Sequence, residues 1–279
     1  MSEPPAAASR RRKVQSLTLP IIGVVCAITV TTSMDASGLS SFSALALLPL
    51  LFLFWWLSHL SRKEVGFKVG HANDYGIAVL FPMAVMGAIA LFAGLAGAVD
   101  LTKTNWPKTA ANLALVTVST FLVAIVTEEG FFRGWLWGSL EKAGMKTGSV
   151  LIWSSIAFAL WHISAVTLDP DFKPTAAQIP VYLCNAAVVG GVWGLLRAQS
   201  GSIIVTSLSH GLWNGLAYVL FGFGSRQGSL GIRNTAVFGP ENGLLGLGLN
   251  LLFAWLLWRL LQKRGEFYAS GLYQVRPSG

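Results

Sequence analysis

The chain has 279 residues, of which 53% are hydrophobic and only 11% are charged, and its mean hydropathy is +0.60. Soluble domains carry about 25% charged residues, so this composition excludes a protein with an ordinary water-facing surface. The net charge of +8 comes from basic residues scattered through short segments, which argues against a nucleic-acid-binding patch. Cys26 and Cys184 both lie in apolar runs, so neither a disulfide framework nor a cysteine metal site is indicated.

Long apolar runs predict an all-α, polytopic membrane protein, because a helix needs about 20 apolar residues to cross a bilayer. In chain order, residues 1–15 are expected to form a disordered cytoplasmic tail. Eight spans then follow within a membrane domain at 16–265, at about 16–34, 42–60, 75–99, 109–139, 148–166, 177–197, 202–221 and 240–261. Glycines interrupt the sixth span and polar residues the seventh, so these two are the weakest. A second cytoplasmic tail is expected at 266–279.

The positions of the basic residues predict the orientation, since positively charged loops stay in the cytoplasm. With the N-terminus in the cytoplasm, most of the 20 Lys and Arg residues fall on the cytoplasmic side of these eight spans. We therefore expect a multi-pass protein of the cell membrane with both termini in the cytoplasm. Depths estimated from a rise of about 1.5 Å per residue place the ionisable groups nearer to this side. A functional site is accordingly expected to open toward the cytoplasm.

Ionisable residues are few within the predicted spans, and they gather in the fourth, fifth and seventh. The members of this group are Glu128, Glu129 and Arg133 in the fourth span, His162 in the fifth, and His210 with the polar Asn214 in the seventh. A charge at the centre of a bilayer costs roughly 2.5–3.5 kcal/mol, so such a group needs a functional or structural reason. The estimated depths bring the three helices' polar groups to about one level of the membrane.

Spacing along the helices orients these side chains. Glu129 and Arg133 are four residues apart with the glutamate first, which is the favourable order for an ion pair within a helix. Glu128 is turned about 100° away from its neighbour and can face a different helix. His210 and Asn214 are also four apart, so they share one face of their helix.

Together these groups contain the chemistry that peptide hydrolysis needs. A carboxylate in an apolar site can act as a general base on water. One histidine can help to activate that water or protonate the leaving amine, while a second histidine and an asparagine amide can stabilise the oxyanion. Alternatively, His162, His210 and Glu128 could hold zinc and leave one position for water. The chain has no HExxH helix, so the usual signature of a soluble zinc protease is missing.

Structural explanations compete with this interpretation. The Glu–Arg pair of the fourth span can neutralise itself, and histidine or asparagine side chains can hold helices together in a membrane. Asn185 and Asn250 are interpreted as such interhelical groups, whereas Glu128 has no local cation. The competing function is a proton-coupled transporter or a scaffold, including an inactive protease, because intramembrane ionisable residues also mark proton pathways. The cluster comes from the fourth, fifth and seventh spans and has no counterpart in the first three, unlike the paired sites of inverted-repeat transporters, which favours the protease.

Three motifs carry a resemblance to a known family. They are EExxxR ("EEGFFR", 128–133), FxxxH ("FALWH", 158–162) and HxxxN ("HGLWN", 210–214). In order and approximate spacing they resemble the CPBP family of intramembrane proteases, also called the ABI or CAAX-protease and bacteriocin-processing family. The eight expected spans are also similar, and the family-like core covers about residues 105–222.

The resemblance implies a role for each matching position. Glu128 would be the general base on the attacking water, assisted by His162. His210 and Asn214 would stabilise the oxyanion. The supporting positions implied by the same motifs are Glu129, Arg133 and Phe158, with the arginine fixing the carboxylates.

Members of the family are often labelled metallopeptidases, although a metal-free glutamate mechanism is also proposed for them. The residues of this chain favour the reaction without a cofactor, with Zn²⁺ as the alternative. The resemblance implies an endopeptidase that acts on a membrane-associated or lipidated peptide or protein, in contact with the lipid bilayer and without nucleic acid. Whether that substrate is prenylated, and the oligomeric state, are left open.

Overall fold

Eight helical segments of the computed structural model, which describes residues 5–169, 171–224 and 226–263, are long and apolar enough to cross a membrane. They are Leu17–Ala36, Ser40–Ser58, Ala72–Leu95, Trp106–Lys142, Thr147–Leu168, Gln178–Ser200, Ile203–Phe221 and Leu244–Lys263. Each overlaps one predicted span, so the prediction of an all-α polytopic membrane protein is confirmed. The first span is the apolar part of helix α1 (Pro5–Ala36). The tail predicted at 266–279 lies outside the described residues, and the one at 1–15 stays a prediction.

Several spans are composite, which their sequences did not indicate. The second joins the 3₁₀ segment η1 (Ser40–Ala46) to α2 (Leu47–Ser58), and the fifth changes from α7 (Thr147–Trp161) to α8 (Ile163–Leu168). The fourth consists of α5 (Trp106–Val126), the π-helix η2 (Glu129–Leu136) and α6 (Trp137–Lys142). The seventh changes from α10 (Ile203–Leu216) to a second π-helix, η3 (Ala217–Phe221). The remaining spans are α4 (Ala72–Leu95), α9 (Gln178–Ser200) and α12 (Leu244–Lys263).

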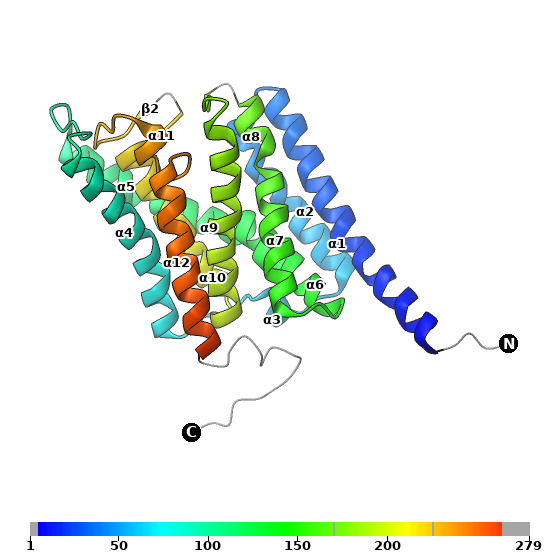
Figure 1. Ribbon diagram of the computed structural model, residues 1–279. Coiled ribbons are helices and arrows are strands. Elements are labelled where there is room, and N and C mark those ends of the chain that lie inside the picture. The colour runs from blue at the N-terminus through cyan, green and yellow to red at the C-terminus, as the bar shows by residue number, and fades with distance from the viewer. Residues whose placement is uncertain (1–4, 170, 225, 264–279) are drawn as a thin grey trace.

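Short elements close the two ends of the bundle. At one end, α3 (Arg62–Val65) is a single helical turn whose first N–H groups are capped by Ser61 and Glu64. At the other end are α11 (Thr235–Phe238) and an antiparallel pair of two-residue strands, β1 (Gly222–Phe223) and β2 (Arg226–Gln227). Figure 1 shows α3 and the end of α12 at its lower edge, with α8, α11 and β2 at its upper edge. We call these the terminal edge and the distal edge.

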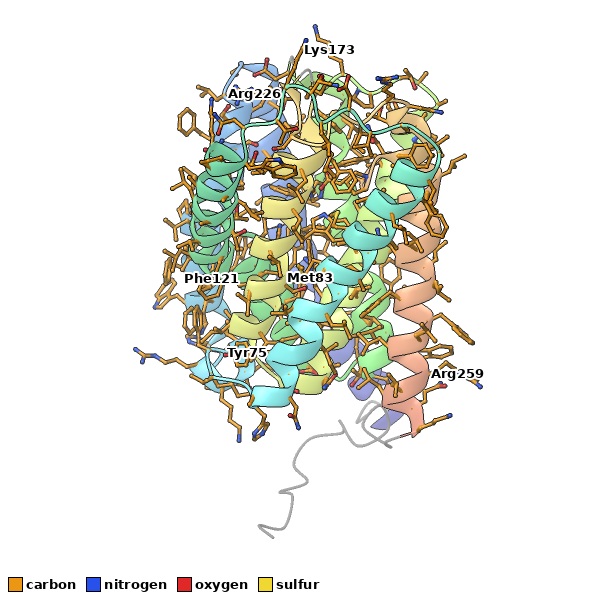
Figure 2. All side chains as sticks on the ribbon, turned by 90° about the vertical axis from the view of Figure 1, so that its left-hand side faces the viewer. Tyr75, Met83, Phe121, Lys173, Arg226 and Arg259 are labelled. Carbon is orange, nitrogen blue, oxygen red and sulfur yellow. The ribbon has the colours of Figure 1, made fainter. Side chains whose placement is uncertain are left out.

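The side chains labelled in Figure 2 mark the same two edges. Tyr75 and Arg259 lie toward the terminal edge, while Lys173 and Arg226 lie at the distal edge. Between the edges, most exposed side chains of the spans are large and apolar, for example Leu91 and Leu122. A soluble protein rarely shows so much apolar surface, so this surface fits lipid.

Helices α9 and α10 form the centre of the bundle. α10 packs against α5, α4 and α9, while α9 also packs against α7 and α12. Glycines permit the closest of these contacts, as is usual between helices in membranes. An added Cβ at Gly211 would lie 2.6 Å from the Thr117 carbonyl oxygen of α5, and Gly215, one turn further on, faces the same residue. This close packing sets the depth at which the "HGLWN" motif faces the fourth span.

Candidate active site

The π-helix η2 carries the charged residues of the fourth span. All eight of its residues are buried, whereas much of α5, which precedes it, faces outward. π-helical turns are rare and occur frequently at functional sites. Gly130 and Gly134 allow the wide turn to fit, because an added Cβ at Gly134 would lie 3.0 Å from the Val65 side chain. The segment therefore places its charges in the centre of the bundle and away from lipid.

Glu129 is fully buried and has two partners. Its Oε1 atom lies 3.5 Å from Arg133 Nη1 and 3.1 Å from His210 Nδ1. Since an ionised carboxylate can only accept, the Nδ1–H of the histidine donates this hydrogen bond. The Glu–Arg pair expected from the spacing is present, and it also orients the imidazole of a second helix. The Glu–Arg pair therefore does more than neutralise its own two charges.

Arg133 is held mainly by aromatic rings. Its guanidinium carbon lies 4.1 Å from the centroid of the Phe158 ring and 5.5 Å from that of Trp193. A desolvated cation over an aromatic face gains about 2 kcal/mol, which offsets part of the cost of burying the arginine. Arg197, a residue that the motifs did not indicate, donates from Nε to the Arg133 carbonyl at 2.9 Å and from Nη2 to the Glu64 carbonyl at 2.8 Å. It ties η2 to α3.

His162 lies where α7 meets α8. Its Nδ1 is 2.8 Å from the Phe158 carbonyl oxygen, so the backbone accepts the Nδ1–H and the other ring nitrogen, Nε2, is left for a ligand. The rings of Phe158 and Trp161 pack edge-on against the imidazole, at centroid distances of 4.4 and 4.7 Å. Trp161 is itself anchored by a 2.8 Å hydrogen bond from Nε1 to Thr31 Oγ1 of α1.

One cavity of about 170 Å³ brings the four predicted catalytic residues together. Glu128, His162, His210 and Asn214 all line it, although they come from three spans. The side chain of Glu128 is 16% exposed, and its Oε2 lies 3.8 Å from His210 Nε2. His210 stacks on the Trp193 ring at a centroid distance of 4.1 Å, which fixes the plane of the imidazole. The two adjacent glutamates therefore differ, since Glu128 faces the cavity and its neighbour faces the arginine.

Sequence reasoning missed a second glutamate at this cavity. Glu241 lies in the loop between α11 and α12, lines the cavity, and accepts a 3.2 Å hydrogen bond from Trp213 Nε1 to its Oε1. Burial raises the pKa of Glu241 from 4.5 to about 7, and the hydrogen bond from the tryptophan only partly opposes this. Asn185 Nδ2 donates to the carbonyl oxygens of Pro240 and Glu241 at 2.9 and 3.1 Å. The Asn250 amide donates to Asn185 Oδ1 at 2.9 Å, so both asparagines do bond across helices.

The cavity extends toward the distal edge. Its lining includes Ser40, Asp169, Phe223 and Glu241, which lie in or beside the segments that join the spans there. The expectation that the site opens on the same side as the chain termini is therefore wrong. The depth of a residue in the membrane does not predict this direction, because it does not show at which end of the helices the cavity reaches the surface.

The residues were tested against the zinc alternative. Among the described residues, no three His, Cys, Asp or Glu side chains are arranged to hold one metal ion together. His210 directs Nδ1 to Glu129, and its other nitrogen already faces Glu128 at 3.8 Å. His162, His210 and Glu128 share the cavity without converging on one position, so this geometry does not fit the alternative with zinc.

The fold and the site together define a polytopic membrane protein with a carboxylate–histidine centre inside its helix bundle. Residues 110–216 match the family model of the type II CAAX prenyl endopeptidases, described as Rce1-like. This match lies within the predicted core at 105–222 and confirms the family expected from the motifs. Over these residues the chain is thus similar to intramembrane endopeptidases of the CAAX type. No curated protein matches it.

Proposed function

We propose that Glu128 activates the water that attacks a peptide bond of a membrane-associated substrate. The difference between the two adjacent glutamates carries this proposal. Glu129 is fully buried against Arg133 and His210, whereas Glu128 faces the cavity with its side chain 16% exposed. A general base must reach both water and substrate, and of the two glutamates Glu128 is the one that can do so.

The steps use residues of this chain. Glu128 takes a proton from water as the water oxygen attacks the carbonyl carbon of the substrate. Negative charge then develops on the carbonyl oxygen, where the Asn214 amide and His210 Nε2–H donate hydrogen bonds; one such donor is worth about 10²–10³ in rate. The buried carboxylate 3.1 Å from Nδ1 stabilises His210 when both of its ring nitrogens carry protons. The C–N bond breaks as the proton returns from Glu128 to the leaving amine, assisted by His162.

The reaction that we propose needs no metal ion. The support is the donor set: each polar residue of the cavity has a role in water activation or oxyanion stabilisation, and the described histidines and glutamates do not converge on one metal position. No step is therefore assigned to zinc.

The substrate is proposed to be a peptide or lipidated protein segment that enters from the distal side. With both termini in the cytoplasm, as the basic residues predict, this side is the outer face of the cell membrane. Aromatic walls formed by Phe158, Trp161 and Trp213 suit apolar parts of a peptide chain.

The proposal is tested by comparing the N- and C-termini of the proteins in the membrane fraction of cells. Cells that express the wild type are compared with cells that express Glu128→Ala at equal levels, by mass spectrometry of new N- and C-termini. Termini that appear only with the wild type support proteolysis and provide substrates. Identical sets of termini would contradict the proposal and favour the non-hydrolytic alternative, a transporter or scaffold that uses the same polar groups.

A further inference from the structure

A second cavity lies beside the catalytic one at the distal edge. It has a volume of about 300 Å³ and is lined by residues of the hairpin β1–β2 and of the loop 239–243, among others. Within the described residues, Phe223 and Glu241 are the two that line both cavities. A peptide that extends from the outer cavity to Glu128 therefore passes the carboxylate of Glu241.

The position of Glu241 is built by contacts from three helices. Trp213, which lies inside the "HGLWN" motif of α10, holds one carboxylate oxygen. Asn185 of α9 holds the backbone on both sides of the Pro240–Glu241 peptide bond, and Asn250 of α12 holds Asn185 in turn. Asn185 and Asn250 are 2% and 0% exposed, so this arrangement is internal. Three buried side chains fix a loop carboxylate at the mouth of the site.

Carboxylates outnumber lysine and arginine side chains in the catalytic cavity, whose basic residues in the described part of the chain are His162 and His210. Glu128, Asp169 and Glu241 line it, and no lysine or arginine does so among the described residues. Asp169 is engaged locally, because its Oδ1 accepts a 2.8 Å hydrogen bond from the Asp171 N–H. Glu128 acts as the base on water in the proposed reaction. The remaining carboxylate, Glu241, has a single side-chain donor, Trp213, which leaves Oε2 without a hydrogen bond from the described residues.

We propose that Glu241 is a specificity-determining residue that binds a basic side chain, lysine or arginine, of the substrate close to the scissile peptide bond. This inference rests on the proposed function for the position of the bond. A cation at Oε2 forms a charge-assisted hydrogen bond inside a cavity with apolar walls, where such a bond is stronger than in water. A neutral side chain such as glutamine can offer Oε2 only an uncharged hydrogen bond, which is weaker.

The ionisation of Glu241 makes the binding of a basic substrate side chain depend on pH. Burial raises its pKa to about 7, so the cation-binding form gains population as the pH rises through 7. Glu128, His210, Tyr182 and Tyr218 are the other ionisable side chains around this carboxylate. The effect that belongs to Glu241 is therefore the difference between the wild type and Glu241→Gln at each pH.

Cleavage kinetics with paired peptides test the inference. Quenched fluorescent peptides are built on a cleavage sequence from the terminus comparison, with lysine or glutamine next to the bond on either side. Wild type is expected to cleave the better lysine peptide with a kcat/KM about tenfold or more above its glutamine partner, as one charged hydrogen bond allows. In Glu241→Gln this ratio falls to about one, because the amide oxygen still accepts from Trp213 but the charge is lost. Asp171→Asn, which removes an exposed carboxylate at the same edge and outside both cavities, serves as the control and keeps the ratio.

A binding measurement separates this inference from the proposed function. Fluorescence anisotropy is measured with two labelled apolar peptides that differ only in a central lysine or glutamine, in the Glu128→Ala protein with and without Glu241→Gln. Tighter binding of the lysine peptide that disappears with Glu241→Gln supports the inference even if the wild type cleaves nothing, a result that would overturn only the proposed function. Equal binding of both peptides, or a lysine preference that survives Glu241→Gln, overturns the inference.

Discussion

Two adjacent glycines of α9 offer a sharp test of how Arg133 is held. An added Cβ at Gly190 would lie 2.7 Å from Arg133 Nη2 and 3.1 Å from Phe158 Cδ1. Both neighbours are buried, since Arg133 and Phe158 are 0% and 3% exposed. At Gly191 the nearest atom to an added Cβ is Ser155 Oγ, at 3.7 Å, which is an ordinary contact.

The two alanine substitutions are therefore expected to have opposite effects. Overpacking a well-filled interior costs about 1–3 kcal/mol. Moving the guanidinium off the Phe158 ring loses up to about 2 kcal/mol more. Gly190→Ala should thus lower stability by about 2–4 kcal/mol, and it should reduce cleavage because Glu129 and His210 move with the arginine. Gly191→Ala should instead gain about 0.5–1 kcal/mol, because alanine favours a helix over glycine.

Thermal melting in detergent and cleavage of a wild-type-dependent peptide measure both effects. At about 2–4 °C per kcal/mol for a chain of roughly this size, Gly190→Ala should melt about 4–16 °C below the wild type. Gly191→Ala should melt at or slightly above the wild-type temperature and retain activity. Equal melting temperatures and activities for the two variants would refute the argument that Arg133 occupies the space over Gly190.

Three further predictions concern the carboxylates and the asparagines. Glu128→Gln should abolish cleavage and leave the melting temperature nearly unchanged. Glu129→Gln should in addition cost about 3–5 kcal/mol of stability, because it leaves a buried arginine unpaired. Equal melting temperatures of the two variants would contradict this difference. Asn250→Leu removes the donor to Asn185 and should cost about 1–3 kcal/mol in thermal melts, and an unchanged melt would refute that bond. Since burial raises the pKa of Glu241 from 4.5 to about 7, folding takes up a proton and stability falls as the pH rises through this range. Glu241→Gln should therefore be more stable than the wild type at pH 8, by up to about 3 kcal/mol, and the difference should vanish below about pH 4.5; a constant difference would exclude titration of this group.

The spans and the clustering of motif residues were predictable because they depend on local properties. A run of about 20 apolar residues is visible in the chain itself, and a spacing of four places Glu129 beside Arg133 in either an α- or a π-helix. The π-helix was not predictable, because over eight residues its apolar pattern differs little from that of an α-helix. The sequence also failed to indicate Arg197, which bonds to carbonyl groups that any residue carries.

Glu241 could not be predicted for a different reason. It lies in a loop without periodicity, and its place in the cavity depends on Asn185, which is 56 residues away in the chain. The asparagine was recognised as an interhelical group, but a lone polar residue in a span does not reveal its partner. The direction in which the cavity opens likewise depends on how the loops at the distal edge are packed.

The ion pair within η2 also bears on how this membrane protein is synthesised. Spans leave the ribosome in order, and the fourth span is made well before the seventh, since His210 follows Glu129 by 81 residues. During that interval neither the histidine nor the packing of α10 is present to compensate the charges. Arg133 follows Glu129 by a single turn, so the two charges can neutralise each other as soon as the span enters the bilayer. The pair can thus help the fourth span to enter the bilayer before His210 is synthesised.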